Sequence, residues 1–315
     1  MSAHTALGGG AEFDLIRAML AEYGDAARGT GDDAAVLDIP PGERVVVSTD
    51  VAVDQVHFRP EWMSAAEIGY RSAMAALSDL AAMAAAPRGM LVTLTLPRAW
   101  HARARGLVLG IARAARAVDA PVVGGDVSGG ATLSIGVTVV GSTAAPLRRD
   151  GARPGDHVWV TGRLGAPGRA LRALLTGAAP RPDDRDRFVA PCARVREAIW
   201  LAAHGATAAV DVSDGLAADL AHLAAASGVR IVLALDDIPA VSGATAEDAA
   251  SSGEEYEIAL AGPAALDTAA FAAAFGIPLT HIGTVVAPGT RGAGVAAERD
   301  GVQIDLRPGF DHFAS

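Results

Sequence analysis

Acidic side chains recur along the chain in short turns that are rich in glycine, serine and threonine. The segments are Gly31-Asp32-Asp33, Ser48-Thr49-Asp50, Ser78-Asp79, Gly124-Gly125-Asp126, Asp211-Val212-Ser213 and Ser213-Asp214-Gly215. Several follow valine runs, a pattern in which strands deliver carboxylates to one place. Carboxylates that converge repel one another and raise one another's pKa, so they need cations. Oxygen-only ligands suit Mg²⁺, which usually bridges carboxylates to phosphates, so the pattern predicts a metal-dependent enzyme that handles phosphate.

The basic residues exclude several classes of phosphate chemistry. The chain has no lysine and no asparagine, so all 26 of its Lys and Arg residues are arginines. A P-loop needs a lysine on the phosphates, and a protein-kinase site needs a strand lysine and a metal-binding asparagine. Schiff-base chemistry also requires a lysine. Phosphate charge must therefore be met by metal ions, arginine side chains and backbone N–H groups.

Length and composition set the broad class. A chain of 315 residues is long enough for two domains of ordinary size. The net charge of −10 argues against sequence-independent binding of nucleic acid. The single cysteine, Cys192, cannot form an intrachain disulfide, so a cytoplasmic location is expected, and a structural role for this thiol is preferred over a nucleophilic one. The sequence predicts neither a signal peptide nor a membrane span.

Periodicity predicts alternating strands and helices in the first half. Strands are expected at 34–37, 44–48, 90–96 and 133–141, and helices at 12–23, 64–85 and 100–118. Ser64 and Glu67 form a capping box at the start of the second helix, and Pro87 is expected to end it. After the first helix, this order is β-β-α-β-α-β, which we interpret as ferredoxin-like.

The second half follows a turn-rich, basic junction at 145–156. We place a domain boundary there, giving domains 1–148 and 149–315. Strands are expected at 158–161, in a segment that reaches Val210, and at 229–235 and 256–260. Helices are expected near 168–175, 193–204 and 214–228. Gly228 is the expected C′ residue of the last of these helices. The segment 180–187 is interpreted as a charged loop without a catalytic role. The chain is therefore predicted to be a two-domain α/β (α+β) protein.

Ten segments, in this order, resemble the aminoimidazole ribonucleotide synthetase-like superfamily and, within it, the thiamine-monophosphate kinase family. They are GDDAAVL at 31–37, STD at 48–50, VHF at 56–58, LSDLAAM at 77–83, GGD at 124–126, RDGARPGD at 149–156, VTG at 160–162, DVSDGL at 211–216, GEEYE at 253–257 and GFDHF at 309–313. Each segment alone is weak evidence, but the ordered set covers nearly the whole chain.

The resemblance implies direct, in-line transfer of the γ-phosphoryl group of ATP to thiamine monophosphate, with several Mg²⁺ ions and no covalent nucleophile. It also implies a homodimer in which the N-terminal domains pair, with ATP near their interface. The implied metal ligands are Asp33, Ser48, Thr49, Asp50, Asp79, Asp126, Asp211 and Asp214, with Thr49, Asp50 and Asp126 sharing one ion. The implied ATP contacts are Gly125, Asp126, Arg149 and Ser213. The implied contacts of thiamine phosphate are His57, Glu254 and Phe310.

Each of these residues also has a purely structural interpretation. Asp, Ser and Gly are the residues of turns and helix caps, and that interpretation is preferred for a few aspartates. These are Asp32, Asp150, Asp156 and Asp219. Asp79 differs because it lies among apolar residues of an expected helix, where an unpaired carboxylate is costly. Structural alternatives stay open for Asp214 as an N-cap, Arg149 as a solvated charge, His57, and Phe310 as a core ring.

The sequence departs from the family pattern on the acceptor side. Ala76 stands where the family usually has asparagine, and Ser252 and Glu255 stand where it has glycine and aspartate. Asp54-Gln55 replaces Glu-Gly, and Phe310 replaces a ring that is often tyrosine. Alternative functions are therefore a related ATP-dependent reaction on another phosphorylated small molecule, or a non-catalytic nucleotide-binding role. The cysteines that selenophosphate synthetase and the hydrogenase-maturation member need near their termini are absent from this sequence.

Overall fold

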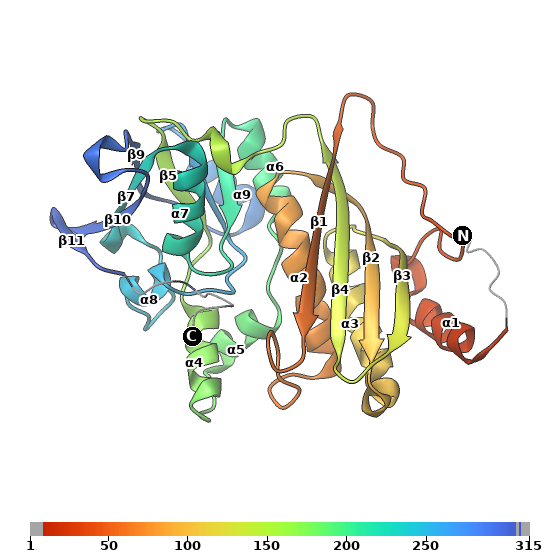
Figure 1. Cartoon of the computed structure of the whole chain (residues 1–315). Helices are drawn as coiled ribbons and strands as arrows, with labels where there is room; N and C mark the ends of the chain where they lie inside the picture. Colours follow the sequence, from red (N-terminus) through yellow and green to blue (C-terminus); the bar gives the residue numbers. More distant parts are fainter. Residues whose placement is uncertain (1–8, 307–308, 310–315) are drawn as a thin grey trace. The chain divides into compact units, whose positions relative to one another are not determined.

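The structure is a computed structural model, and it describes residues 9–306 and Gly309. The chain forms two compact units, each considered by itself below (Figure 1). The N-terminal unit comprises the described residues up to 80 together with 85–144, and the C-terminal unit comprises 81–84 and the described residues from 145 onward. Among the described residues, no helix is both long and apolar enough to cross a membrane.

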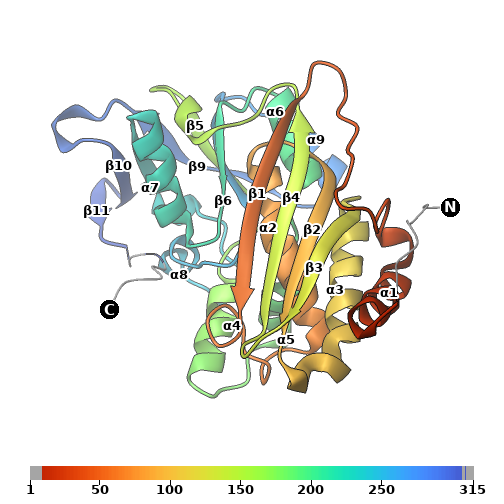
Figure 2. The same ribbon diagram turned by 45° about the vertical axis from the view of Figure 1, so that its right-hand side comes forward.

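The N-terminal unit is a four-stranded sheet with helices on one face (Figure 2). Its elements are α1 (Ala11–Tyr23), β1 (Arg44–Val53), α2 (Ala65–Ala82), β2 (Ala86–Leu96), α3 (Ala104–Ala117), β3 (Val122–Gly129) and β4 (Ser134–Thr143). The strand order is β1-β4-β2-β3, so β1 and β3 are the edges. Alternate residues of β2 and β4, such as Val92 and Val137, are buried together with Leu77 of α2 and Ile111 of α3. This aliphatic layer is the core of the unit.

The other face of this sheet is open in a single chain. Along β1 the outward residues Val45, Val47 and Val51 are 55%, 60% and 51% exposed. They alternate with Ser48 and Asp50, which lie on the helix side of the strand, as the two-residue period of a strand requires. β1 therefore presents an apolar edge-strand surface on one side and polar side chains to α2 on the other.

Several local predictions are confirmed and others are wrong. The backbone N–H of Ser64 donates to Glu67 at 2.7 Å and that of Glu67 donates to the Ser64 hydroxyl at 3.3 Å, which is the predicted capping box. No strand forms at 34–37, where Val36 is 93% exposed, while 122–129 forms β3. The observed order is thus β-α-β-α-β-β. Pro87 lies inside β2, at a register shift against β4, where the missing N–H is tolerated.

The C-terminal unit is built around a seven-stranded mixed sheet in the order β11-β10-β7-β9-β5-β8-β6. Its elements are β5 (His157–Thr161), α4 (Ala166–Leu175), α5 (Pro182–Val189), α6 (Val195–Ala203), β6 (Ala208–Asp211), α7 (Leu216–Ser227), β7 (Arg230–Ala234), α8 (Ala246–Ala250), β8 (Ile258–Gly262), α9 (Thr268–Phe275), β9 (Leu279–Val286), β10 (Gly294–Arg299) and β11 (Val302–Ile304). Val160, Leu220, Ile231 and Ile282 are fully buried in its aliphatic core.

Two features of this unit bear on the predictions. α7 ends at Gly228 in the left-handed conformation, as expected for a C′ glycine. The segment 180–187 is not a loop, because α5 begins at Pro182 with Asp183 and Asp184 in its first turn. Proline at the first helical position and acids in the first turn both favour a helix start. α5 brings the partly buried side chain of Arg187 to the buried carboxylate of Glu257.

Candidate functional site

The first group of predicted residues lies between β1 and α2. Ser48 and Asp50 are two residues apart on β1 and face the helix that carries Asp79. The Ser48 hydroxyl donates a hydrogen bond to the Asp79 carboxylate. Burial, and then the negative charge of Asp79, raise the pKa of Asp50 to about 6. The structure therefore brings together three predicted metal ligands, two of them carboxylates whose repulsion a cation would relieve.

Thr49 and Asp126 do not join this group within one chain. The Thr49 hydroxyl is on the opposite side of β1 and lies 2.9 Å from the hydroxyl of Thr138. Across the sheet, Asp50 of β1 is aligned with Gly125 of β3, the residue before Asp126. Strands β4 and β2 lie between β1 and β3. Three strand spacings amount to about 14 Å along the sheet, whereas metal ligands lie about 2 Å from their ion. The expectation that Thr49, Asp50 and Asp126 share an ion is therefore not met within one chain.

Asp33 lies on the segment that precedes β1, and it is exposed. Its backbone N–H donates to the side chain of Asp32 at 2.9 Å, which supports the turn interpretation of Asp32. Within the described part of the chain, no three His, Cys, Asp or Glu side chains are arranged to hold a metal ion by themselves.

Gly125 requires its glycine for a steric reason. Its φ is +158°, and a Cβ at this position would lie 1.9 Å from the carbonyl oxygen of Val92 on the neighbouring strand. No side chain can occupy that space without separating β3 from β2. The backbone next to Asp126 is thus kept bare and exposed, as an approach by a phosphate group would need.

A second group of predicted residues lies on the loop between β6 and α7. One carboxylate oxygen of Asp219 accepts the backbone N–H groups of Ser213, Asp214 and Gly215 at 3.0, 3.1 and 3.1 Å. Burial, and then the charges of Asp211 and Asp214, raise the pKa of Asp219 to about 7. The N-cap of α7 is Gly215, so the N-cap alternative for Asp214 is wrong. Asp219 organises this loop, in agreement with its structural interpretation.

Glu254 lies against the same loop. Its backbone N–H donates to the Ser213 carbonyl at 2.7 Å, and the Tyr256 hydroxyl donates to its carboxylate at 2.8 Å. A Cβ on Gly309 would lie 2.9 Å from the Asp214 carbonyl oxygen, so the chain returns to this loop near its end. Phe310 lies outside the described residues. The C-terminal unit thus brings Ser213, Asp214 and Glu254 together.

The remaining predicted residues are placed as follows. His57 is in the turn after β1, and its Nδ1 accepts the N–H of Val53 at 3.1 Å, so a neutral ring carries its proton on Nε2. Arg149 has an exposed side chain, while its carbonyl accepts a hydrogen bond from Ser227 at 2.6 Å. Cys192 is exposed, but the protein atoms around its thiol partly desolvate it and raise its pKa, which disfavours a nucleophilic thiolate.

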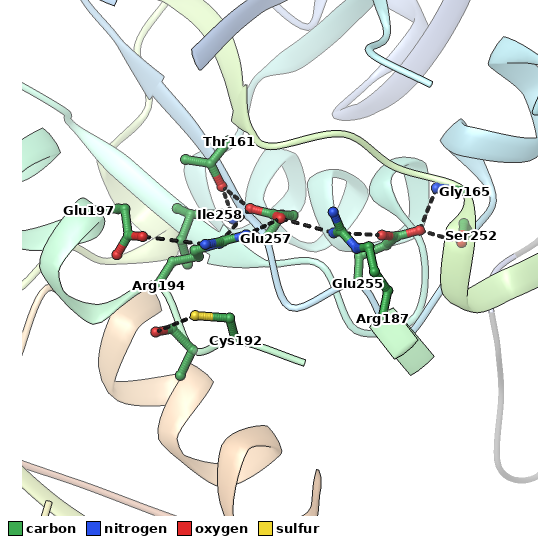
Figure 3. Close-up of polar contacts among 11 residues, drawn as sticks. Thr161, Gly165, Arg187, Cys192, Arg194, Glu197, Ser252, Glu255, Glu257 and Ile258 are labelled. Carbon is green, nitrogen blue, oxygen red and sulfur yellow. Dashed lines mark hydrogen bonds and ion pairs between the residues drawn. The ribbon is translucent and has the colours of Figure 1, made fainter. Parts of the chain in front are cut away.

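Two departures from the family pattern contact each other. The Ser252 hydroxyl donates to the Glu255 carboxylate at 2.6 Å, and the same oxygen accepts the backbone N–H of Gly165 (Figure 3). The longer side chain at 255 is therefore held by the hydroxyl at 252. Burial raises the pKa of Glu255 to about 7. Another departure, Ala76, is fully buried in α2.

Comparison with known proteins places the chain in one family. It matches the models of the AIR synthase related protein N-terminal domain over residues 31–143 and C-terminal domain over 153–295. It is 36% identical to the thiamine-monophosphate kinase of Rhodopirellula baltica over 292 residues, 86% of this chain and 87% of the relative.

Solved structures agree with this result. The thiamine-monophosphate kinase of Stenotrophomonas maltophilia K279a matches with a TM-score of 0.79 and 36% identity, covering 94% of this chain and 97% of that one. A structure described as AaThiL complexed with AMPPCP and TMP matches with a TM-score of 0.76 and 29% identity, covering 96% of both chains. These matches confirm the predicted α/β fold class. The chain belongs to the AIR synthase-related family and, within it, to the thiamine-monophosphate kinases.

Proposed function

We propose that the protein transfers the γ-phosphoryl group of ATP to thiamine monophosphate, giving ADP and thiamine diphosphate. The observation that carries the proposal is the similarity, over nearly the whole chain, to thiamine-monophosphate kinases, one of them described in complex with AMPPCP and TMP. AMPPCP is an analogue of ATP, and TMP in this enzyme family stands for thiamine monophosphate. A panel of phosphorylated acceptors tests the proposal: ADP release should be fastest with thiamine monophosphate.

Mg²⁺, in several ions, is the metal that we propose. The donor set fits it, because the side chains of Ser48, Asp50 and Asp79 offer only oxygen atoms. Burial, and then the negative charge of Asp79, raise the pKa of Asp50, and a bound cation would compensate that charge. The proposed ligands are Asp33, Ser48, Thr49, Asp50, Asp79, Asp126, Asp211 and Asp214. When bound, Mg²⁺ would neutralise the phosphates as they approach one another.

The reaction requires little covalent chemistry from the side chains of the protein. An oxygen of the acceptor phosphate is already anionic, so it attacks the γ-phosphorus as the bond to the bridging oxygen breaks and ADP leaves. We propose that positioning supplies most of the catalysis, without a covalent nucleophile or a general base. The proposed ATP contacts are Gly125, Asp126, Arg149 and Ser213. On the acceptor side, we propose that Glu254 faces the cationic thiazolium, Phe310 packs on its ring, and His57 donates Nε2–H to the phosphate.

We further propose that the protein is a cytoplasmic homodimer, in which domain 1–148 binds ATP and metal and pairs with its copy, and 149–315 is the C-terminal α/β domain. The open face of β1 supports the pairing, since Val45, Val47 and Val51 form an exposed apolar row on an edge strand. Such a surface is usually covered in a native assembly. The lone Cys192 is consistent with a reducing compartment.

Light scattering tests the dimer with a matched pair of variants. Val47→Asp places a charge in the apolar row and should shift the protein towards monomer at micromolar concentration, because burying an unpaired carboxylate is unfavourable. Val302→Asp, at a β11 position with a similar exposed fraction of 63%, should leave the mass unchanged. A wild-type monomer of 31.8 kDa whose specific activity survives dilution would contradict the dimer.

A further inference from the structure

The C-terminal unit contains a buried ion-pair cluster around Glu257 that the proposed reaction does not use directly. Glu257 is fully buried, and its carboxylate accepts hydrogen bonds from Arg187, Arg194 and Thr161, which with it form the Glu257 cluster (Figure 3). Arg194 binds both carboxylate oxygens, at 2.8 and 2.6 Å. Arg187 donates at 3.0 Å and Thr161 at 2.7 Å.

This cluster joins Glu257 to three elements that are distant from it in sequence. Arg187 comes from α5, Arg194 from the start of α6, and Thr161 from the end of β5. The Thr161 hydroxyl also accepts the backbone N–H of Ile258, so it fixes both the side chain and the following peptide of Glu257. Gly162, the residue after Thr161, lets the backbone pass close to the Glu257 carboxylate, because a Cβ at this position would lie 2.3 Å from a carboxylate oxygen.

The residues just before Glu257 have a conformation that needs such support. Glu254 and Tyr256 have φ of +64° and +53°, a region that costs a non-glycine residue about 1 kcal/mol or more. Residues in this region persist when their surroundings determine the backbone from several sides. Here, the inward carboxylates of Glu255 and Glu257 hold the segment on one side, while Glu254 and Tyr256 bind each other.

The same segment is hydrogen-bonded to the loop of the candidate site. The N–H groups of Glu255 and Tyr256 donate to the Val212 carbonyl at 3.1 and 2.8 Å, and Val212 donates to the Glu257 carbonyl at 2.8 Å. Glu254 donates to Ser213 at 2.7 Å. The side of this loop nearest α7 is held separately by Asp219. Loss of the cluster should therefore release residues 253–256 more than the loop itself.

We propose that Glu257, fixed by Arg187, Arg194 and Thr161, is a positioning residue that holds the backbone of 254–256 in the conformation that presents Glu254. The proposal rests on the proposed function in one respect, namely that Glu254 serves the acceptor. It assigns the charged face of α5 and the start of α6 to the site, although neither carries a residue that touches a substrate. The expected consequence of breaking the cluster is weaker binding of the acceptor, with a smaller effect on ATP.

Two variants with matched ion pairs test this proposal. Arg194→Met removes the two-point contact with Glu257, where the two side chains are 13% and 1% exposed. Arg169→Met removes a similar contact with Asp184, where they are 16% and 5% exposed, on α4 and α5. Both should lower the melting temperature. Hydrogen–deuterium exchange of a peptide covering 253–257 should become about tenfold faster in Arg194→Met and stay unchanged in Arg169→Met.

Kinetics provide the second readout. Arg194→Met should raise the KM for thiamine monophosphate about tenfold, with a change in the KM for ATP of about twofold or less, whereas Arg169→Met should change neither. Should Arg194→Met fail to fold, Arg187→Met is the milder variant, because Arg187 is 33% exposed and supplies one of the hydrogen bonds. Arg187→Lys keeps the cation and should restore most of the acceptor affinity.

The outcomes separate this proposal from the proposed function. Unchanged exchange at 253–257 in Arg194→Met, or equal acceleration in Arg169→Met, overturns the positioning role. So does faster exchange with an unchanged acceptor KM. If the wild-type protein itself does not phosphorylate thiamine monophosphate, the proposed function fails, and the exchange comparison alone decides whether the cluster holds the segment.

Discussion

Asp50→Asn and Asp79→Asn should each abolish phosphoryl transfer while leaving the fold intact. Each substitution removes one negative charge from the pair that, with Ser48, forms the group between β1 and α2. We expect turnover to fall by about 1,000-fold or more, as for other groups that stabilise charge in a transition state. Steady-state ADP release measures the loss, and circular dichroism checks the fold. Near wild-type rates in either variant would show that these acids do not bind a catalytic ion.

Stability without metal gives an independent check on the same pair. The pKa of Asp50 is raised from 3.8 to about 6 in the folded chain, so folding favours the protonated form. In a chelating buffer, its contribution to stability is therefore complete below about pH 4 and is lost as the pH rises through about 6. Asp50→Asn should flatten this decline and be at least as stable as the wild type at pH 7. Added Mg²⁺ should stabilise the wild type at pH 7 and have a smaller effect on the variant.

Asp219→Ala should also cause a large loss of turnover, although Asp219 is not expected to touch a substrate. The variant leaves three backbone N–H groups of Ser213, Asp214 and Gly215 without their acceptor. The loop that carries the proposed ATP contact and metal ligand should then sample several conformations. We expect kcat/KM for ATP to fall about 100-fold, the order found when a positioning contact is lost. Part of the stability cost should be offset by weaker repulsion with Asp211 and Asp214.

A second capping aspartate of the same unit provides the control for Asp219. Asp267 accepts the backbone N–H of Ala270 at the start of α9, at 2.8 Å, and it is exposed. Asp267→Ala should lower the melting temperature slightly and leave the kinetics unchanged. Equal losses of activity in the two variants would mean that Asp219 matters for stability alone.

Local signals in the sequence predicted local structure well. The capping box of Ser64 and Glu67, the end of α7 at Gly228 and the turn at Asp32 each depend on residues a few positions apart. The start of α5 at Pro182 could have been predicted on the same grounds, because a proline followed by two acids favours a helix start. Treating 180–187 as a loop hid Arg187, and with it the Glu257 cluster.

These local sequence signals did not predict the order of the strands in the N-terminal sheet. Asp50 and Asp126 lie in sequence segments of similar composition, yet the structure places them in β1 and β3, which two other strands separate in the sheet. Turn chemistry does not encode which strands become neighbours, because that depends on packing across the whole unit. The hydrogen bond between Ser252 and Glu255 could not be predicted from the sequence either, because each residue was interpreted separately as a departure from the family pattern. Their proximity is a product of the fold.

The most direct test of the account is the reaction of the purified wild-type protein with ATP, Mg²⁺ and thiamine monophosphate. Chromatographic separation of the thiamine phosphates, with ADP measured in the same samples, follows both products. We predict one thiamine diphosphate formed for each ADP released, and neither product after chelation of the metal. ADP released at saturating thiamine monophosphate without thiamine diphosphate would contradict the account.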